Sequence, residues 1–167
     1  MVKLFIQKGA NVNIKAYDKT TPLHMAALNG HKNVVEHLIK NGANIDAMAD
    51  KRRTPIHYAV VAAKVDDEYK YLSTVEFLIK NGANVNSQDT DGFTPLEISY
   101  IMLQSKFDKG RKQGRKDLVK LLKKHGARND KRPEILEFVF HNPGQFCTFL
   151  PKDYRTCKNE ISDILMA

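Results

Sequence analysis

The chain lacks tryptophan and has only two cysteines among its 167 residues. The cysteines, Cys147 and Cys157, lie near the C-terminus and form no CxxC pair. Such sparse cysteines argue against a disulfide framework and against a cysteine-based zinc site, and they favour reduced thiols inside a cell. We therefore expect an intracellular protein.

Long apolar runs are also missing. The opening segment MVKLFIQKGANV has few apolar residues after Ile6, so we predict no signal peptide. No stretch approaches the roughly 18 consecutive apolar residues that a membrane span requires. The hydrophobic fraction of 42% is nevertheless sufficient for a folded core. The predicted location is the cytoplasm, and no transmembrane segment is expected.

Positive charge is concentrated in one segment. The formal net charge is +8. Residues 106–132 contain twelve lysines and arginines against three aspartates, a balance of +9 that leaves the remainder of the chain at −1. The basic character is therefore local, and it requires either a solvated helix face or an anionic ligand as its explanation.

An internal repeat organises most of the chain. One pentapeptide motif occurs three times, as GANVN at 9–13, GANID at 42–46 and GANVN at 82–86. A second marker begins twelve residues after each of these glycines, as TPLH at 21–24, TPIH at 54–57 and TPLE at 94–97. With the glycine at 126, the repeat lengths are 33, 40 and 44 residues.

A repeat of about 33 residues that carries TPLHxA is typical of ankyrin repeats. The stretch TPLHMAALNGHKNVVEHLIKNGANI closely resembles the consensus of that family. The resemblance implies an all-α repeat fold, an ankyrin solenoid of stacked helix-turn-helix units with β-hairpin fingers, plus a short helical cap and tail. We predict ankyrin repeats over 1–128, divided as 1–8 (partial), 9–41, 42–81 and 82–125, then a capping helix at 129–142 and a C-terminal tail at 143–167.

Each part of the repeated motif has a physical explanation. The threonine and proline of TPLH suit a helix cap and the first helical position. The glycine of GANVN ends the second helix, because glycine adopts the left-handed conformation without strain. The resemblance implies that His24 and His57 bond to the threonine and the neighbouring turn. Glu97 replaces this histidine in the third unit, which predicts a weaker network there.

The N-terminal segment and two insertions leave alternatives open. Met1 aligns with Val34 of a second helix, so the apolar residues at 2–6 should lie uncovered at an end of the stack. We favour a fragment of a longer array over coverage by a partner or by the fold itself. The insertions AAKVDDEYKYLST and LQSKFDKGRKQGRK either lengthen the turn between two helices or add a contact surface.

Catalytic and metal-binding patterns are missing. The sequence has no GxGxxG, no phosphate-binding loop, no GxSxG and no HExxH, and none of its six histidines has a metal-binding spacing. We therefore predict a protein that is not an enzyme and that needs neither a cofactor nor a metal.

The favoured hypothesis is a monomeric protein-interaction scaffold. The resemblance implies that a partner protein binds the finger tips and the concave face of the first helices, where aromatic residues and arginine are the commonest hot spots. The candidate partner-binding residues are Tyr17, Asp18, Lys19, Met25, Leu28, Asn29, Asp50, Lys51, Arg52, Arg53, Tyr58, Asp91 and Phe93.

One alternative is a ubiquitin-ligase adaptor. Leu150-Pro151, followed by an acidic residue and the segment 160–166, resembles the F-box-like C-terminal segment of ankyrin proteins from poxviruses and intracellular bacteria. That resemblance implies recruitment of ubiquitin-ligase components by the tail. For a viral protein or a secreted effector, the location would be the cytosol or nucleus of a host cell.

The other alternative is binding of anionic polymers or of a membrane through the basic segment 106–132. Lys120, Lys123 and Lys124 should face away from the apolar side of their helix, which a solvated face also explains. No aromatic residues are interleaved between Lys109 and Arg132, so a base-stacking surface is missing. Nucleic acid is therefore not the favoured partner.

Overall fold

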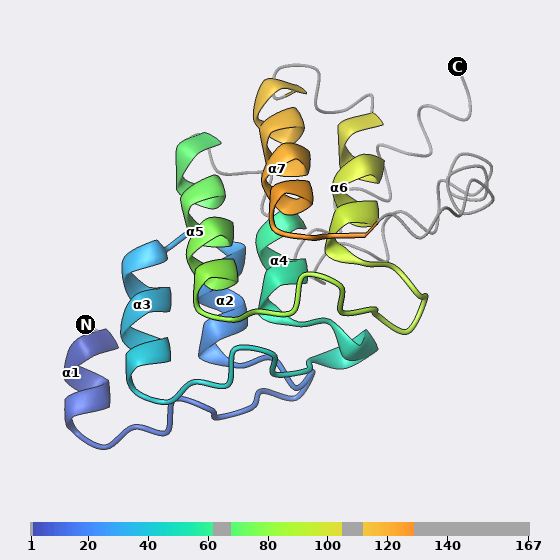
Figure 1. Ribbon diagram of the computed structural model, residues 1–167. Helices are drawn as coiled ribbons and strands as arrows, with labels where there is room; N and C mark the ends of the chain where they lie inside the picture. Colours follow the sequence, from blue (N-terminus) through green and yellow to red (C-terminus); the bar gives the residue numbers. More distant parts are fainter. Residues whose placement is uncertain (1, 62–67, 105–111, 129–167) are drawn as a thin grey trace, which may run out of the picture. The chain divides into compact units, whose positions relative to one another are not determined.

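The computed structural model describes residues 2–61, 68–104 and 112–128 (Figure 1). By contacts between Cα atoms the chain divides into Met1–Arg128 and Asn129–Ala167. The predicted capping helix at 129–142 and the tail at 143–167 lie outside the described residues, as does part of each insertion.

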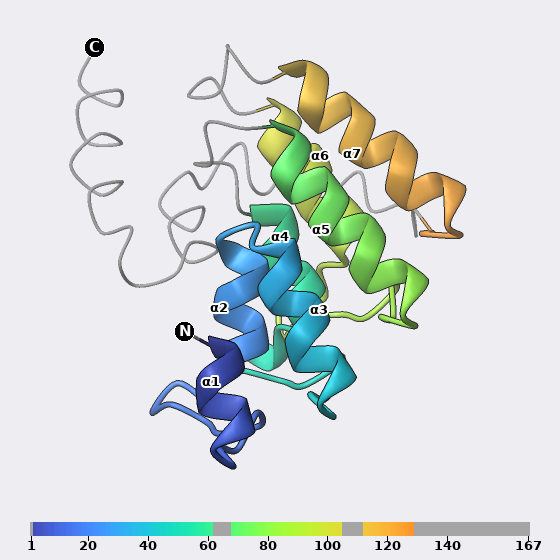
Figure 2. The ribbon, with the colours of Figure 1, turned by 90° about the vertical axis from the view of Figure 1, so that its left-hand side faces the viewer.

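Helices dominate the described residues of Met1–Arg128. They are α1 (Val2–Gln7), α2 (Pro22–Leu28), α3 (Lys32–Lys40), the 3₁₀ turn η1 (Asp50–Arg52), α4 (Pro55–Val61), α5 (Glu68–Lys80), α6 (Pro95–Gln104) and α7 (Lys112–Lys124). Helices α2, α4 and α6 pack against one another in order and form an inner row, while α3, α5 and α7 form an outer row (Figures 1 and 2). The predicted solenoid of stacked helix-turn-helix units is confirmed.

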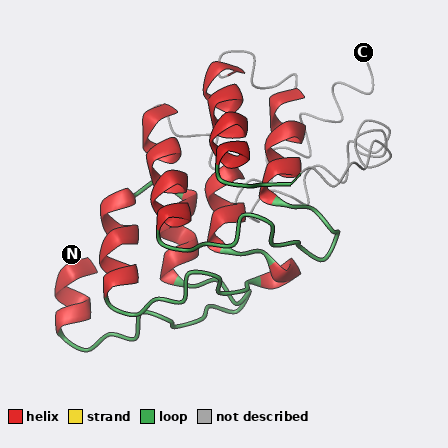
Figure 3. Ribbon diagram, in the orientation of Figure 1, coloured by secondary structure: helices red, strands yellow, loops and turns green. Residues whose placement is uncertain are grey.

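The fingers between the units differ from the β-hairpins that we expected. Within the described residues the connections are loops, apart from the 3₁₀ turn η1 in the second finger, and none contains a strand (Figure 3). Each finger is a tight turn with two backbone hydrogen bonds; the outer one runs from Ala16 to Thr20, from Ala49 to Arg53 and from Asp89 to Phe93. Turns this short provide no continuous ladder of backbone hydrogen bonds, which a strand requires.

The core consists of apolar positions that recur in every unit. They are Leu23, Ile56 and Leu96 in the inner row and Leu38, Leu78 and Leu122 in the outer row, and all are buried. Each such side chain contributes roughly 1.5–3 kcal/mol when it leaves water. Because they pack against the helices of the adjacent unit, the stability of each unit depends on its neighbours.

The recurring glycine ends the outer helices, as the sequence predicts. Gly9, Gly42, Gly82 and Gly126 all have φ between 81° and 94°, in the left-handed region. The first asparagine of the pentapeptide then shapes the loop, because its Oδ1 accepts the backbone N–H two residues later. These bonds run from Asn13 to Asn11, from Asp46 to Asn44 and from Asn86 to Asn84.

The last residue of the pentapeptide connects adjacent units. Asn13 donates from Nδ2 to the carbonyl oxygen of Gly42 at 2.9 Å, and its Oδ1 accepts the N–H of Asn44 at 2.8 Å. Asn86 makes the corresponding pair of bonds with Gly126 and Arg128. The pentapeptide is therefore a helix stop at one end and an inter-unit link at the other.

Asp46 occupies the linking position in the second unit. Its Oδ1 accepts the N–H of Asn84 at 3.0 Å. A carboxylate has no N–H, so Asp46 cannot donate to the carbonyl oxygen of Gly82 as Asn13 does to Gly42. The junction between the second and third units therefore has one of these two hydrogen bonds.

A buried arginine connects the last described helix to the middle of the stack. Arg115 of α7 is 1% exposed, and its Nη1 donates to the carbonyl oxygen of Val60 at 2.6 Å. Its guanidinium carbon lies 5.8 Å from the ring centre of Tyr71 on α5. Val60 belongs to α4, so this bond joins α7 to the inner row. The basic segment is therefore not uniformly solvated.

The N-terminal helix leaves its apolar side chains uncovered, as we expected. No residue of α1, which the structure describes in full, is buried. Val2, Leu4 and Phe5 are exposed large hydrophobic residues, and Ile6 is partly exposed.

Replacing Asp46 with asparagine tests the linking hydrogen bonds. We expect Asp46→Asn to raise the free energy of unfolding by about 0.5–1.5 kcal/mol, because it adds a donor opposite Gly82. Urea denaturation of both proteins measures the difference. Asn13→Asp is the matched control, which should lower stability by removing the same donor. A stability loss in Asp46→Asn would contradict this account.

Candidate functional site

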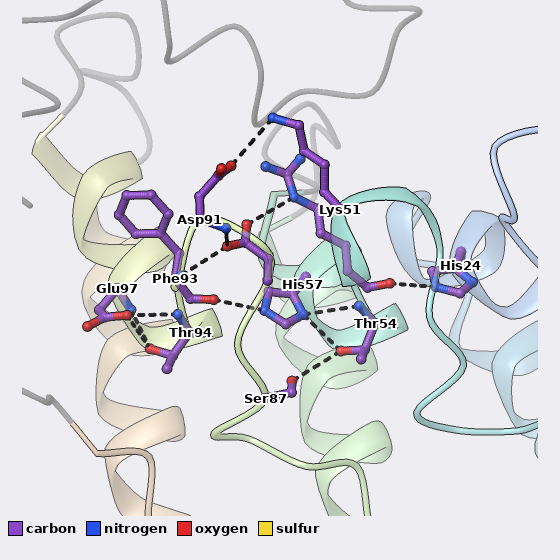
Figure 4. Close-up of polar contacts among 11 residues, drawn as sticks. His24, Lys51, Thr54, His57, Ser87, Asp91, Phe93, Thr94 and Glu97 are labelled. Carbon is purple, nitrogen blue, oxygen red and sulfur yellow. Dashed lines mark hydrogen bonds and ion pairs between the residues drawn. The ribbon is translucent and has the colours of Figure 1, made fainter.

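Three finger tips lie in register beside the N-terminal ends of the inner helices (Figures 1 and 4). Backbone hydrogen bonds connect consecutive tips. Asp50 N–H donates to the carbonyl oxygen of Asp18, and Thr90 N–H donates to that of Lys51, both at 2.9 Å. Side chains at the tips therefore project from a shared backbone framework.

Opposite charges face each other across the tips. The ammonium group of Lys19 lies 3.9 Å from a carboxylate oxygen of Asp50, and that of Lys51 lies 3.4 Å from one of Asp91 (Figure 4). All four side chains are substantially exposed, so each pair contributes little to stability. Their main effect is to present both signs of charge along one edge.

Buried histidines connect two of the inner helices, α2 and α4, to the following finger. In the first unit Nδ1 of His24 accepts the N–H of Thr21 at 3.1 Å, and Nε2 lies 3.1 Å from the carbonyl oxygen of Arg53. Because a backbone N–H can only donate, we infer that Nδ1 is unprotonated and that Nε2 donates to the carbonyl. The predicted roles of these histidines thus extend across the unit boundary.

The second histidine repeats this geometry. His57 accepts the N–H of Thr54 at 3.1 Å, and its Nε2 lies 3.2 Å from the carbonyl oxygen of Phe93 (Figure 4). Burial lowers the pKa of His57 to about 4 and also lowers the pKa of His24. Both rings are therefore neutral near pH 7, in the state that their hydrogen bonds require.

Glu97 preserves the local arrangement in the third unit. Its carboxylate accepts the N–H of Thr94 at 2.8 Å and the hydroxyl of Thr94 at 3.0 Å, while Glu97 N–H donates back to that hydroxyl (Figure 4). The expected weakening of this local network is therefore wrong. What the substitution removes is the donor, because a carboxylate cannot donate to a carbonyl of a following finger as His24 does.

Three predicted partner-binding residues are buried. Leu28 is 6% exposed, Arg53 7% and Phe93 5%. The Nε of Arg53 lies 3.3 Å from the carboxylate of Asp89, whose side chain is fully buried, so Arg53 joins the second finger to the third. Arg53 and Phe93 are packed within the fingers and Leu28 within α2, so the burial of these three residues does not favour direct contact with a partner.

The other candidates are accessible to different degrees. Tyr17 is 101% exposed, and Met25 and Asn29 are exposed on or just after α2. Tyr58 is half-buried, with its ring centre 5.0 Å from that of His24 in an edge-to-face contact. Asp18 is partly buried, and its Oδ1 accepts the hydroxyl of Thr20 at 2.7 Å, which shapes the first tip.

We use the name finger surface for the accessible part of this set. It comprises Tyr17, Asp18, Lys19, Met25, Asn29, Asp50, Lys51, Arg52, Tyr58 and Asp91. Sequence reasoning missed two exposed apolar residues beside it, Ile14 and Met48. Met48 aligns with Lys15 and Gln88 of the other units, so an apolar residue at an otherwise polar repeat position was the available signal.

Charged residues occupy strained backbone positions at the tips. Lys19 and Arg52 have φ of 58° and 56°, and Lys51 also has φ of 58°. The third unit has Gly92 where Lys19 and Arg52 stand, with φ of 81°. The left-handed conformation costs a non-glycine residue roughly 1–2 kcal/mol. The first two fingers therefore carry cationic side chains at positions that glycine would occupy with less strain.

Other kinds of site find no support in the described part of the chain. Residues 2–61, 68–104 and 112–128 contain no cluster of three or more His, Cys, Asp or Glu side chains placed to hold a metal ion. None of the helices described is both long enough and apolar enough to cross a membrane.

Sequence comparisons agree with this repeat architecture. A family model described as ankyrin repeats, in three copies, matches residues 1–89, which is more than half of the chain. No curated protein matches the chain.

The low pKa of His57 predicts that the folded protein loses stability in acid. Below pH 6.5 an unfolded chain protonates this residue, whereas the folded protein does not until about pH 4. Stability from His57 should therefore be present above pH 6.5 and decline by up to about 3 kcal/mol as the pH falls to 4. Urea unfolding across this range should show a smaller decline for His57→Gln, which cannot titrate. Parallel declines in the two proteins would refute the role of His57.

Proposed function

The chain belongs to the ankyrin-repeat family, and we propose that it is a non-catalytic scaffold that binds another protein through its finger surface. Members of this family generally serve as protein–protein interaction modules, and the stacked units described above have the same architecture. The proposal concerns which residues of this chain make the contact.

The observation that carries the proposal is the combination of exposure and order at the tips. Tyr17 projects fully into solvent, yet its finger is joined to the next by the hydrogen bond between Asp50 and Asp18. A partner that contacts this edge meets a framework that is already formed, so little conformational entropy is lost on binding. Tyrosine and arginine at such positions are the residue types that most often dominate binding energy.

Backbone strain supports the same surface. Lys19 and Arg52 are retained in left-handed conformations, although Gly92 shows that the repeat accepts glycine at this position. Strain of this kind is commonly found where a side chain serves binding. The inner helices add Met25 and Tyr58 behind the tips, which provide apolar area next to the charges.

The ubiquitin-ligase adaptor hypothesis depends on a different part of the chain. Its basis is the tail at 143–167, which lies outside the described residues. It stays a prediction from the sequence, and removal of residues 145–167 should abolish association with ligase components while the finger surface keeps its partner.

Glycine substitutions separate binding from folding at this surface. We expect Lys19→Gly combined with Arg52→Gly to leave stability unchanged or raised by up to about 1 kcal/mol, because the strain is relieved. Adding Tyr17→Ala should weaken partner binding at least tenfold. The measurement is crosslinked affinity capture from cell extract, quantified against the wild-type chain, with thermal unfolding as the check on folding.

The matched control is Lys40→Ala combined with Lys80→Ala, which removes two exposed lysines from the outer row. Capture of the same proteins should persist with this control and fall with the triple variant. If every captured protein binds the folded triple variant at the wild-type level, the finger surface is not the binding site.

A further inference from the structure

The outer helices permit an internal comparison, because each ends at an equivalent glycine. Two residues before that glycine all three helices have lysine, namely Lys40, Lys80 and Lys124. Six residues before it α3 has Glu36 and α5 has Glu76, but α7 has Lys120. Three residues before it Ile39 and Ile79 correspond to Lys123. In α7, lysine thus stands where α3 and α5 have an acid and where they have an apolar residue; α1, which ends before Gly9, also has a lysine, Lys3, at the first of these positions.

The acid that α7 lacks has a clear role in the sister helices. Glu36 pairs with Lys40 at 2.6 Å, and Glu76 pairs with Lys80 at 2.7 Å. The hydrogen bond from the lysine lowers the pKa of each glutamate, so both remain ionised near neutral pH. On α3 and α5 the lysine charge is therefore balanced on the same helix.

On α7 the balance is only partial, through Asp117 and through the electrostatic interaction of Lys124 with Glu76 of α5. Lys116, Lys120, Lys123 and Lys124 are all exposed. Asp117 lies 3.3 Å from Lys120 and also accepts hydrogen bonds from Gln113. Among residues 2–61, 68–104 and 112–128, no other carboxylate is within ion-pair distance of these lysines.

The lysines share one side of the helix. At 3.6 residues per turn they fall within an arc of about 100° and span about 12 Å along the axis. The opposite side of α7 is buried, with Leu118 and Leu122 fully covered by the stack. Four lysine ammonium groups therefore lie on the exposed side of a helix whose other side is packed against the stack. Among the described residues, the aromatic ring beside them is that of Tyr100, whose centre lies 5.5 Å from the ammonium group of Lys123.

We propose that this face of α7 binds the phosphate backbone of duplex nucleic acid without reading base sequence. A duplex carries about one negative charge per 1.7 Å of its axis, a density that can neutralise several closely spaced lysines together. Lysine contacts phosphate as a point charge and does not need aromatic neighbours, which serve to stack on unpaired bases. The lack of aromatic residues between Lys109 and Arg132 is therefore compatible with contact to the phosphate backbone.

The same geometry disfavours insertion into a membrane. Basic amphipathic helices that lie in a bilayer interface bury their apolar side in lipid. The apolar side of α7, including Leu118 and Leu122, is already buried against the stack. What remains is an electrostatic surface, and it is separate from the finger surface, so the two proposals do not depend on each other.

Salt-dependent binding to a 20-base-pair DNA duplex tests the proposal. For the full chain, fluorescence anisotropy should give a dissociation constant of about 10⁻⁴–10⁻⁶ M at physiological salt. A plot of the logarithm of the association constant against the logarithm of the salt concentration should have a slope of about −3, as expected for three to four phosphate contacts. Replacing the four lysines with Lys116→Gln, Lys120→Gln, Lys123→Gln and Lys124→Gln should reduce affinity at least tenfold and flatten the slope.

The matched control removes four exposed lysines elsewhere, with Lys8→Gln, Lys32→Gln, Lys40→Gln and Lys80→Gln. Its net charge equals that of the α7 variant, so retained binding by the control supports a localised site. Equal loss in both variants would mean that net charge alone is responsible, and it would overturn the proposal.

Two competing ligands complete the design. Vesicles containing phosphatidylserine represent a membrane surface, and polyglutamate represents an acidic protein segment. Weaker binding to both than to the duplex, at equal salt, supports the proposal. Tighter binding to either, with the same dependence on the α7 lysines, would reassign the surface to that class of partner.

Discussion

The hydrogen bond by which the histidine of α2 and of α4 connects its helix to the next finger is the interaction on which the order of the finger tips depends. His24 and His57 hold carbonyl oxygens of the following unit at 3.1 and 3.2 Å. The finger tips have no strand ladder within the described residues, so these bonds, the Arg53–Asp89 pair and one backbone hydrogen bond between consecutive tips fix their positions. Packing of the helices stabilises the fold, and the polar bonds between units hold the finger tips in an ordered row.

Polar and apolar contacts stabilise different parts of each unit, the apolar contacts among the helices and the polar contacts in the loops and fingers. The large apolar residues are buried between the helices, while the asparagine and histidine bonds lie where one unit meets the next. A buried histidine can serve there only as a neutral ring with a donor and an acceptor. Glu97 shows the limit of substitution, because it reproduces the acceptor but not the donor.

The helix pairs, their order and the glycine stops could be predicted because they depend on local patterns that recur in the sequence. The inter-unit bonds could not, since Asn13 and Gly42 are 29 residues apart and meet only after the helices stack. Burial of Arg53 and Phe93 was missed for the same reason. Both occupy the same position in their fingers, and the sequence of one finger alone predicts an exposed side chain there.

Arg115 illustrates a further limit. It lies in a stretch rich in lysine and arginine, and only its contacts with α4 and with the ring of Tyr71 reveal that it is buried. Conversely, the unusual charge of α7 can be seen in the sequence when α3, α5 and α7 are aligned on the glycines that follow them.

Every polar connection described between fingers or loops joins adjacent units. A chain built from such pairwise joints is modular, so whole units can be gained or lost while the remaining joints keep their geometry. For this protein the length of the row of fingers is therefore an evolvable quantity, adjustable in steps of one finger, whereas its chemistry changes at single side chains.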